Sequence, residues 1–214
     1  MITLVFADDH PVARAGIRTL LSEAPDIQIV GEAENGDDAM RLVEQLRPKI
    51  LLLDLKMPGL PSAEIEKRVR ANFPEISTLV LTAHDRDAYL VNMMDAGAIG
   101  LLNKDTTAER LIGAIRRAAS GEILFDGSQY RRAERWRKVA GEKWESLTER
   151  ERQVLKLQVQ GIEKVEIARQ LEIGQRTVDY HINNILKKLK VKSLKDALSW
   201  FNEYLSDDPI IIPG

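Results

Sequence analysis

The chain has 214 residues, enough for two domains that each bury a hydrophobic core. It contains no cysteine, which excludes a disulfide framework and thiolate metal sites. The net charge is only −2, and the longest apolar runs, such as the one that ends at Leu53, are far too short to span a bilayer. The N-terminus lacks a basic stretch followed by an apolar signal segment, so we expect a cytoplasmic location with no membrane attachment.

Short apolar runs alternate with segments of helical period from Ile2 to about Ser120, which is typical of a parallel sheet covered by helices. The runs are rich in Val, Ile and Leu, as strands buried on both faces must be. The predicted strands are Thr3–Ala7, Ile27–Ala33, Ile50–Asp54, Ser77–Thr82 and Ile99–Leu102. The predicted helix starts are Pro11, a cap at Asp37, a cap at Ser62, Asp85 or Arg86, and a cap at Thr106 or Thr107.

No strand of any length is predicted beyond Gly121. Helical stretches are predicted at Glu149–Gln160, Lys164–Leu171, Arg176–Leu189 and Leu194–Leu205. The resulting organisation is a domain over 1–120, a partly helical linker over 121–145, a helical domain over 146–205 and a loose tail over 206–214. The first 120 residues carry 14 Lys and Arg against 18 Asp and Glu, and the remainder carries 17 against 15. This mild asymmetry does not by itself separate a DNA-binding domain from a solvated helical domain.

Polar residues follow the predicted strands where the strands of a parallel sheet bind ligands, at their carboxyl ends. Asp8 and Asp9 follow the first strand, Asp54 ends the third, Thr82 ends the fourth and Lys104 lies just beyond the fifth. Three gathered carboxylates need a hard cation, and oxygen ligands with room for water suit Mg²⁺. The added hydroxyl and ammonium predict a pocket for a phosphoryl group.

Five motifs in order resemble a response-regulator receiver domain: Ala-Asp-Asp-His-Pro at 7–11, Leu-Asp-Leu-Lys-Met-Pro-Gly at 53–59, Leu-Thr-Ala at 81–83, and Asp-Ala-Gly-Ala with Asn-Lys-Asp between 95 and 105. The resemblance implies an α/β, flavodoxin-like fold with a five-stranded parallel sheet of order 2-1-3-4-5. It implies that Asp54 accepts a phosphoryl group from a sensor histidine kinase, and that Thr82 and Lys104 contact its oxygens. It also implies that Mg²⁺ is held by Asp8, Asp9, Asp54 and the Lys56 carbonyl.

Two positions depart from the receiver pattern. Leu101 stands where the family usually has an aromatic residue that reports phosphorylation, and Pro61 stands where glycine is common. These changes predict that phosphorylation of Asp54 affects the face built from the fourth helix, the fifth strand and the fifth helix differently, or more weakly, than in the usual receiver pattern. Taken singly, Asp8 and Asp9 fit helix caps, Asp54 fits the end of a strand and Lys104 fits a solvated loop residue. His10 is expected to line the mouth of the site or to be exposed, and not to be a ligand.

The C-terminal helices have helix-turn-helix spacing, with a Thr148 cap before the first helix and a short turn at Gly174. The segment Leu147–Leu198 resembles the four-helix DNA-binding domain of the NarL/FixJ (LuxR-type) regulators. The resemblance implies that the helix Arg176–Leu189 reads duplex DNA and that the last helix pairs two subunits into a homodimer. Phosphate contacts are implied for Arg176, Thr177, Lys187, Lys188 and Lys192, and base contacts for Asp179, Tyr180 and Asn183.

Departures in this half concern charge. Asp179 stands where a basic residue is common, so repulsion from the phosphates is expected unless the carboxylate accepts from a cytosine amino group. Glu163 replaces a Ser or Thr cap, and Val165 replaces a commonly basic residue.

The interpretation that follows is a phosphorylation-controlled transcription regulator, whose output is binding and which is not primarily an enzyme. Several alternatives stay open. Leu101 favours a regulator that works without phosphorylation, and Asp179 favours an adaptor whose helical domain binds protein instead of DNA. The C-terminal helices taken alone would also fit a module that only dimerises. A phosphohydrolase ranks last, because it would want a carboxylate two positions after Asp54, where Lys56 stands.

Overall fold

The computed structural model describes residues 1–83 and 85–205. The chain forms two compact units, a first unit that comprises Met1–Arg131 and a second unit that begins at Arg132. The predicted tail over 206–214 lies outside the described residues. No helix in the described ranges combines the length and the apolar character needed to cross a membrane.

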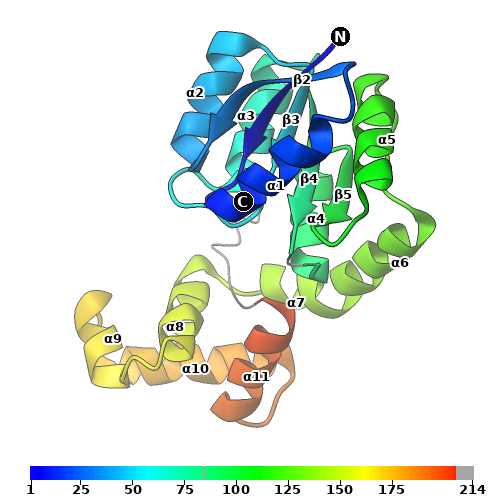
Figure 1. The fold of residues 1–214 in the computed structure, drawn as a ribbon. Helices are drawn as coiled ribbons and strands as arrows, with labels where there is room; N and C mark the ends of the chain where they lie inside the picture. Colours follow the sequence, from blue (N-terminus) through cyan, green and yellow to red (C-terminus); the bar gives the residue numbers. More distant parts are fainter. Residues whose placement is uncertain (84, 206–214) are drawn as a thin grey trace. The chain divides into compact units, whose positions relative to one another are not determined.

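The first unit is built on a parallel sheet (Figure 1). Its strands are β1 (Ile2–Ala7), β2 (Ile27–Ala33), β3 (Ile50–Leu53), β4 (Ser77–Thr82) and β5 (Gly100–Asn103). The strand order is β2-β1-β3-β4-β5 and every pairing is parallel, which confirms the predicted topology. Consecutive parallel strands need crossover connections, and helices supply them.

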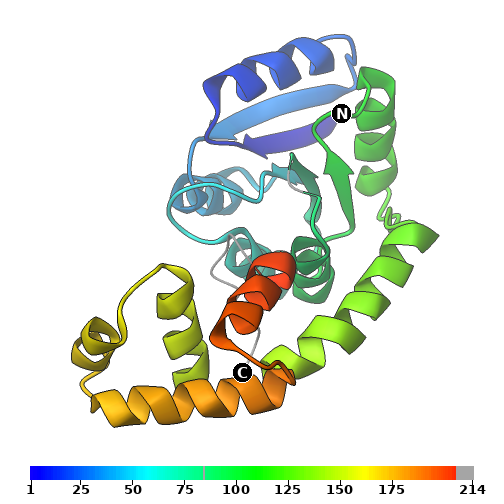
Figure 2. The ribbon, with the colours of Figure 1, turned by 90° about the horizontal axis from the view of Figure 1, so that it is seen from below.

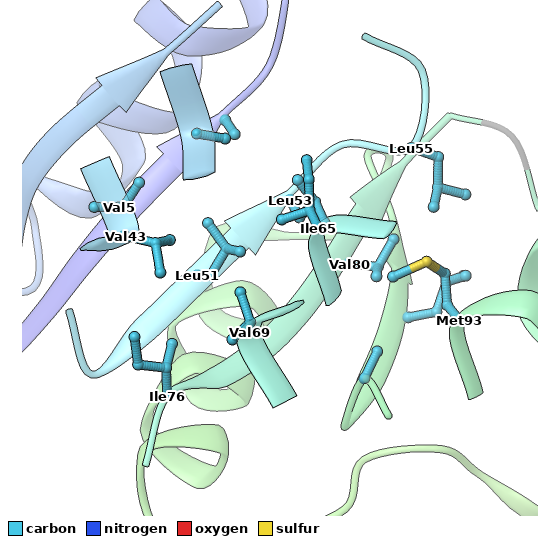
Figure 3. Close-up of a cluster of buried hydrophobic side chains, with 14 of the residues drawn as sticks. Val5, Val43, Leu51, Leu53, Leu55, Ile65, Val69, Ile76, Val80 and Met93 are labelled. Carbon is cyan, nitrogen blue, oxygen red and sulfur yellow. The ribbon is translucent and has the colours of Figure 1, made fainter. Parts of the chain in front are cut away.

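The crossover helices are α1 (Pro11–Leu21), α2 (Gly36–Leu46), α3 (Ser62–Asn72) and α4 (Asp87–Ala96), and α5 (Ala108–Ala119) follows the last strand. Alternate residues of the strands face two separate hydrophobic cores. One core joins Leu51, Leu53 and Val80 to side chains of α2, α3 and α4, among them Val43, Val69 and Met93 (Figure 3). The other joins Leu52 and Leu81 to α1 and α5. The buried sheet is therefore a rigid support for the loops at its carboxyl edge.

Two predicted helix caps are wrong. The second helix is capped by Asn35, whose side-chain oxygen accepts from the Asp38 N–H at 2.8 Å, and Asp37 lies inside the helix. The third helix follows the extended residue Pro61, while Ser62 is its first residue. The Ser62 hydroxyl donates to the Leu55 carbonyl at 3.1 Å, so it holds the loop after β3 instead of capping the helix. Thr107 caps the fifth helix as predicted.

Helix α6 (Gly127–Trp136) runs across the boundary between the units, and a π-helical segment (Arg137–Gly141) and α7 (Glu142–Glu145) continue it without a break. The four helices that follow are α8 (Glu149–Val159), α9 (Lys164–Gln170), α10 (Gln175–Leu189) and α11 (Leu194–Tyr204). Figure 2 shows α10 as the longest of them, and it contacts α8, α9 and α11. Thr148 and Glu151 form a capping box at the start of α8, which confirms the Thr148 cap.

Candidate functional site: an acidic pocket and a recognition helix

The carboxyl edge of the sheet brings together residues that lie far apart in the sequence. Backbone hydrogen bonds continue the strand pairing one residue beyond the strands: the Asp8 N–H donates to Ala33 O at 3.0 Å, and the Asp54 N–H donates to Ala7 O at 2.9 Å. The Lys104 N–H likewise donates to Thr82 O at 2.9 Å. The sheet therefore fixes the backbones of the predicted site residues at one edge.

Lys104 contacts two of the predicted carboxylates. Its Nζ lies 2.8 Å from Asp8 Oδ2 and 3.0 Å from Asp54 Oδ2. Burial, the largest influence, raises the pKa of Asp54, although the Lys104 ammonium opposes the shift. Burial lowers the pKa of Lys104, but hydrogen bonds and charge from Asp8 and Asp54 outweigh it, so that pKa is raised. Lys104 is therefore held as a cation against two buried carboxylates.

The acidic cluster has the donor set of a hard-cation site. One ligand atom from each of Asp8, Asp9, His10 and Asp54 lies within 4.8 Å of the others. Asp8 Oδ2 lies 2.8 Å from Lys104 Nζ and Asp9 Oδ1 lies 2.6 Å from His10 Nδ1. Several carboxylate oxygens gathered this closely fit a bound Mg²⁺ ion, which takes oxygen ligands. The exposed His10 lies beside the cluster, with its Nδ1 2.6 Å from Asp9 Oδ1, and the expectation that it is not a ligand stays a prediction.

Arg14 is a site residue that the sequence interpretation missed. Its side chain is buried in α1, and Nη1 donates to the Asp8 carbonyl at 2.7 Å while Nη2 pairs with the Glu34 carboxylate. The Arg14 guanidinium thus anchors the loop that carries Asp8 and Asp9. An arginine on the inward side of a predicted helix was the available signal, because a buried charge needs a partner.

The loop after Asp54 is held from three sides. The Leu55 N–H donates to Asp54 Oδ1 at 2.8 Å, and the Ser62 hydroxyl binds the Leu55 carbonyl. Gly36 at the start of α2 donates its N–H to Pro58 O at 2.9 Å, and a Cβ at Gly36 would lie 1.9 Å from the Leu60 oxygen. Only glycine permits this approach of α2 to the loop.

The remaining receiver positions belong to the neighbouring strands β4 and β5 and to the loop after β3. Thr82 is fully buried at the end of β4 and is paired in register with Asn103. Lys56 Nζ lies 5.9 Å from the ring centroid of Tyr89 in α4. Leu101 is 4% exposed and belongs to the same hydrophobic core as Tyr89. An aliphatic side chain therefore fills the position of the usual aromatic residue.

Helix α10 buries one face and presents the other. Val178, Ile182, Ile185 and Leu189 are buried, as the helical period predicts. The opposite face carries five of the predicted DNA-binding residues, all exposed: Arg176, Thr177, Tyr180, Asn183 and Lys187. Lys192, in the turn after α10, is also exposed. Within the described ranges Arg176, Lys187 and Lys192 form no ion pair, so their charges are available to an anionic partner.

Two predicted DNA-binding residues have partners within the second unit. Lys188 Nζ lies 2.7 Å from Glu151 Oε2, a carboxylate that is 3% exposed, so its expected phosphate contact stays a prediction. Asp179 Oδ1 lies 2.7 Å from Lys164 Nζ in α9. Glu163 precedes α9 without a side-chain capping bond, and Val165 is 63% exposed.

Comparisons with known proteins agree with both halves of this description. The response regulator receiver domain matches residues 4–116, and the luxR family of bacterial regulatory proteins matches residues 145–201. The chain is 37% identical over 210 residues to the nitrate/nitrite response regulator protein NarL of Escherichia coli, an alignment that covers 94% of this chain and 95% of NarL. It is 34% identical over 197 residues to the response regulator protein VraR of Staphylococcus aureus, covering 92% of this chain and 94% of VraR.

A solved structure of RcsB from Salmonella enterica serovar Typhimurium, bound to promoter rprA in the presence of the phosphomimetic BeF3⁻, has a TM-score of 0.61 and 26% identity. The match covers 94% of this chain and 99% of that one. The two family models, the full-length relatives and the strand order lead to one assignment. The chain belongs to the two-component response regulators of the NarL/FixJ family, in which a receiver domain is joined to a LuxR-type helix-turn-helix domain.

Proposed function

We propose that this protein is a transcription regulator whose binding to duplex DNA is controlled by phosphorylation of Asp54 by a sensor histidine kinase. The observation that carries the proposal is the position of Lys104 Nζ, 2.8 Å from Asp8 and 3.0 Å from Asp54. A phosphoryl group on Asp54 would bring anionic oxygens to this ammonium, which then exchanges carboxylate contacts for phosphoryl contacts. The same chain carries a helix with an exposed, partly cationic face.

In the proposed transfer, a carboxylate oxygen of Asp54 attacks the phosphorus of a phosphohistidine. The phosphorus–nitrogen bond breaks, the kinase histidine keeps the electron pair, and an acyl phosphate forms on Asp54. The Leu55 N–H, 2.8 Å from Oδ1, orients the carboxylate for this attack. The Thr82 hydroxyl and the Lys104 ammonium would bind the phosphoryl oxygens. The protein assists this one phosphoryl transfer and the slow hydrolysis of its own acyl phosphate. Its output is the binding of DNA.

Receiver domains bind Mg²⁺ at an acidic pocket, and the cluster of Asp8, Asp9 and Asp54 is of this kind. We propose that these three carboxylates and the Lys56 carbonyl hold the ion. A bound Mg²⁺ would neutralise charge on the carboxylates and on the incoming phosphoryl group. Arg14, through its bond to the Asp8 carbonyl, would keep the loop of Asp8 and Asp9 in place.

On DNA, the cations Arg176, Lys187 and Lys192 and the Thr177 hydroxyl are proposed to contact phosphates, while Tyr180 and Asn183 contact base edges. Two copies are proposed to pair through α11, whose Lys195 and Ser199 are exposed whereas Trp200 and Phe201 are buried. We also propose that the receiver domain ends at residue 120 and that the helix-turn-helix domain begins at residue 146. The proposed location of the protein is the cytoplasm.

The test is a gel shift on duplex DNA with the full-length protein, before and after treatment with a small phosphodonor. Wild type is expected to bind more tightly after treatment, and Asp54→Asn is expected to show no change. Asp105→Asn, an exposed acid next to Lys104, is the matched control and keeps the response. A response of Asp54→Asn equal to that of wild type would contradict the role of Asp54.

Leu101 supports a second candidate function, a regulator that binds DNA without control by phosphorylation. The aliphatic side chain lacks the ring whose rotation transmits the signal in the usual receiver pattern. In this case wild type, Asp54→Asn and phosphodonor-treated protein would bind equally. Leu101→Tyr would then be expected to introduce a response to the phosphodonor that wild type lacks.

A further inference from the structure

An ion pair joins the two helices of the helix-turn-helix. Lys164 is the first residue of α9, Asp179 lies in the second turn of α10, and Lys164 Nζ is 2.7 Å from Asp179 Oδ1. Both side chains are partly exposed, 42% for Lys164 and 49% for Asp179. The pair therefore lies at the surface, where a ligand can reach it.

A contribution to folding stability does not explain why the Lys164–Asp179 pair is present. Exposed ion pairs contribute little to folding, and α9 and α10 already contact each other and bury apolar residues, among them Ile167 and Val178. Asp179 is also the only acidic residue among the fifteen of α10. An anion at this position would repel DNA phosphates unless a nearby cation cancelled its charge or the carboxylate accepted a hydrogen bond from a base.

One oxygen of the Asp179 carboxylate is paired and the other accepts no hydrogen bond within the described ranges. Lys164 binds Oδ1, whereas Oδ2 accepts no hydrogen bond from any residue that the structure describes. Asp179 is four positions before Asn183, so the two lie on the same face of α10, next to the exposed ring of Tyr180. An acceptor-only group is thus held on the face that carries the predicted base contacts.

We propose that Asp179 reads a cytosine in the major groove and that Lys164 is the positioning residue that makes this possible. This inference rests on the proposed function. The open oxygen would accept from the cytosine N4 amino group. Guanine and thymine present acceptors there, and adenine presents an acceptor N7 beside its amino group, so a carboxylate disfavours all three. Lys164 holds the carboxylate in one orientation and cancels its repulsion from the phosphates.

The experiment is selection from a pool of duplexes with randomised sequence, using full-length protein treated with a phosphodonor. Wild type is expected to prefer cytosine at one position of each half-site. Asp179→Ala is expected to lower that preference roughly tenfold, the effect of one hydrogen bond to a base edge, and to leave the other positions unchanged. Lys164→Gln is expected to weaken the same preference and also to lower affinity for every sequence.

Two variants separate this role from a structural one. The double variant Lys164→Gln with Asp179→Ala is expected to recover the general affinity that Lys164→Gln loses, because the unpaired carboxylate is gone. Glu166→Gln is the matched control, since Glu166 is an acid of the same hairpin that pairs with Arg169 at 2.7 Å inside α9. Its base preferences are expected to equal those of wild type.

The outcomes distinguish this inference from the proposed function. If wild type binds duplex DNA and Asp179→Ala keeps every base preference, the reading role of Asp179 is wrong while the proposed function stands. If Lys164→Gln changes thermal stability but neither affinity nor preference, the positioning role of Lys164 is wrong. If wild type shows no salt-dependent binding to any duplex, the proposed function itself is wrong.

Discussion

Asp8, Asp9 and Asp54 bring three carboxylates to one sheet edge, and within the described ranges the Lys104 ammonium and the His10 imidazole contact them. This leaves an excess of negative charge that a divalent cation would relieve. A ligand that binds only the folded state raises its stability. We therefore expect millimolar Mg²⁺ to raise the melting temperature of wild type.

The shift should depend on the acids of the cluster. Asp9→Asn removes one proposed ligand and is expected to abolish most of the Mg²⁺-dependent rise, measured by thermal unfolding with and without a chelator. Asp105→Asn changes an exposed acid close to the cluster and should keep the full rise. Equal shifts in all three proteins would locate the ion elsewhere.

Glu66 predicts a pH dependence of stability. This α3 residue is 2% exposed, and burial raises its pKa to about 7, with Thr78 and Arg70 opposing the shift. The folded protein therefore keeps a proton that the unfolded chain releases near its ordinary value of 4.5. Stability is highest below that value and falls as pH rises toward 7, by roughly 3 kcal/mol in total.

Glu66→Gln removes this titration. Urea unfolding is monitored by circular dichroism across this pH range. The unfolding free energy of Glu66→Gln is expected to vary less with pH than that of wild type and to be higher at neutral pH. Glu64→Gln changes a half-buried α3 residue that pairs with Arg68 at 2.9 Å; it controls for charge and should retain the wild-type slope. An unchanged slope in Glu66→Gln would show that another group titrates.

At the scale of elements, the strands were well predicted, whereas two of the helix caps were not. The ranges of β2 and β4 match the predicted ones, because buried parallel strands are continuous apolar runs with clear limits. The caps at Asp37 and Ser62 were wrong, because Asn35 and Pro61 supply equally suitable extended residues nearby. Capping depends on which side chain other contacts leave free, and Ser62 is bound to the Leu55 carbonyl.

Convergence of Asp8, Asp54 and Lys104 could be predicted because sheet topology alone brings strand ends together. The pairs Arg14–Glu34, Lys164–Asp179 and Glu151–Lys188 could not. They join residues 15 to 37 positions apart through the orientation of long side chains, which periodicity does not determine. Lys188 is an example: its predicted contact is with a DNA phosphate, and the helical period gave no sign that its Nζ lies 2.7 Å from Glu151 Oε2.

Glu151 links two elements of the second unit. Its carboxylate accepts from the Thr148 N–H and from Lys188 Nζ, each at 2.7 Å, and is nearly fully buried. Glu151→Ala removes the capping box and leaves the Lys188 ammonium without its partner. We expect a loss of about 2 kcal/mol in the unfolding free energy. Glu149→Ala, in the first turn of α8 but exposed, should lose much less.

Tryptophan fluorescence measures this loss selectively. All three tryptophans, Trp136, Trp144 and Trp200, lie in the second unit, so the signal is blind to unfolding of the first. Lys188→Met should also destabilise this unit while changing the salt dependence of DNA binding little. If Lys188→Met instead lowers the salt slope without loss of stability, the residue contacts phosphate and its pairing with Glu151 is secondary.

On the scale of the whole molecule, control of DNA binding by phosphorylation is a coupling between two sites on one chain. Coupling between binding equilibria is reciprocal: if occupation of the acidic pocket raises DNA affinity by some factor, DNA must raise affinity for the pocket's ligand by the same factor. The equality of the two factors holds whichever residues couple the two sites, whether or not Leu101 is among them. Measuring both factors therefore tests regulation without any assumption about the conformational change.

Beryllofluoride, which mimics a phosphoryl group, makes both sides of this relation measurable. We expect it to tighten binding of full-length protein to a selected duplex, and the duplex to lower by an equal factor the beryllofluoride concentration needed for half-saturation. Asp54→Asn should bind the duplex without either effect. Lys104→Ala tests the contact that carries the proposal: it should retain DNA binding but lose the coupling, because the cation that would bind the new oxygens is gone. A factor of one in wild type would select the phosphorylation-independent regulator, with Leu101 as the structural reason.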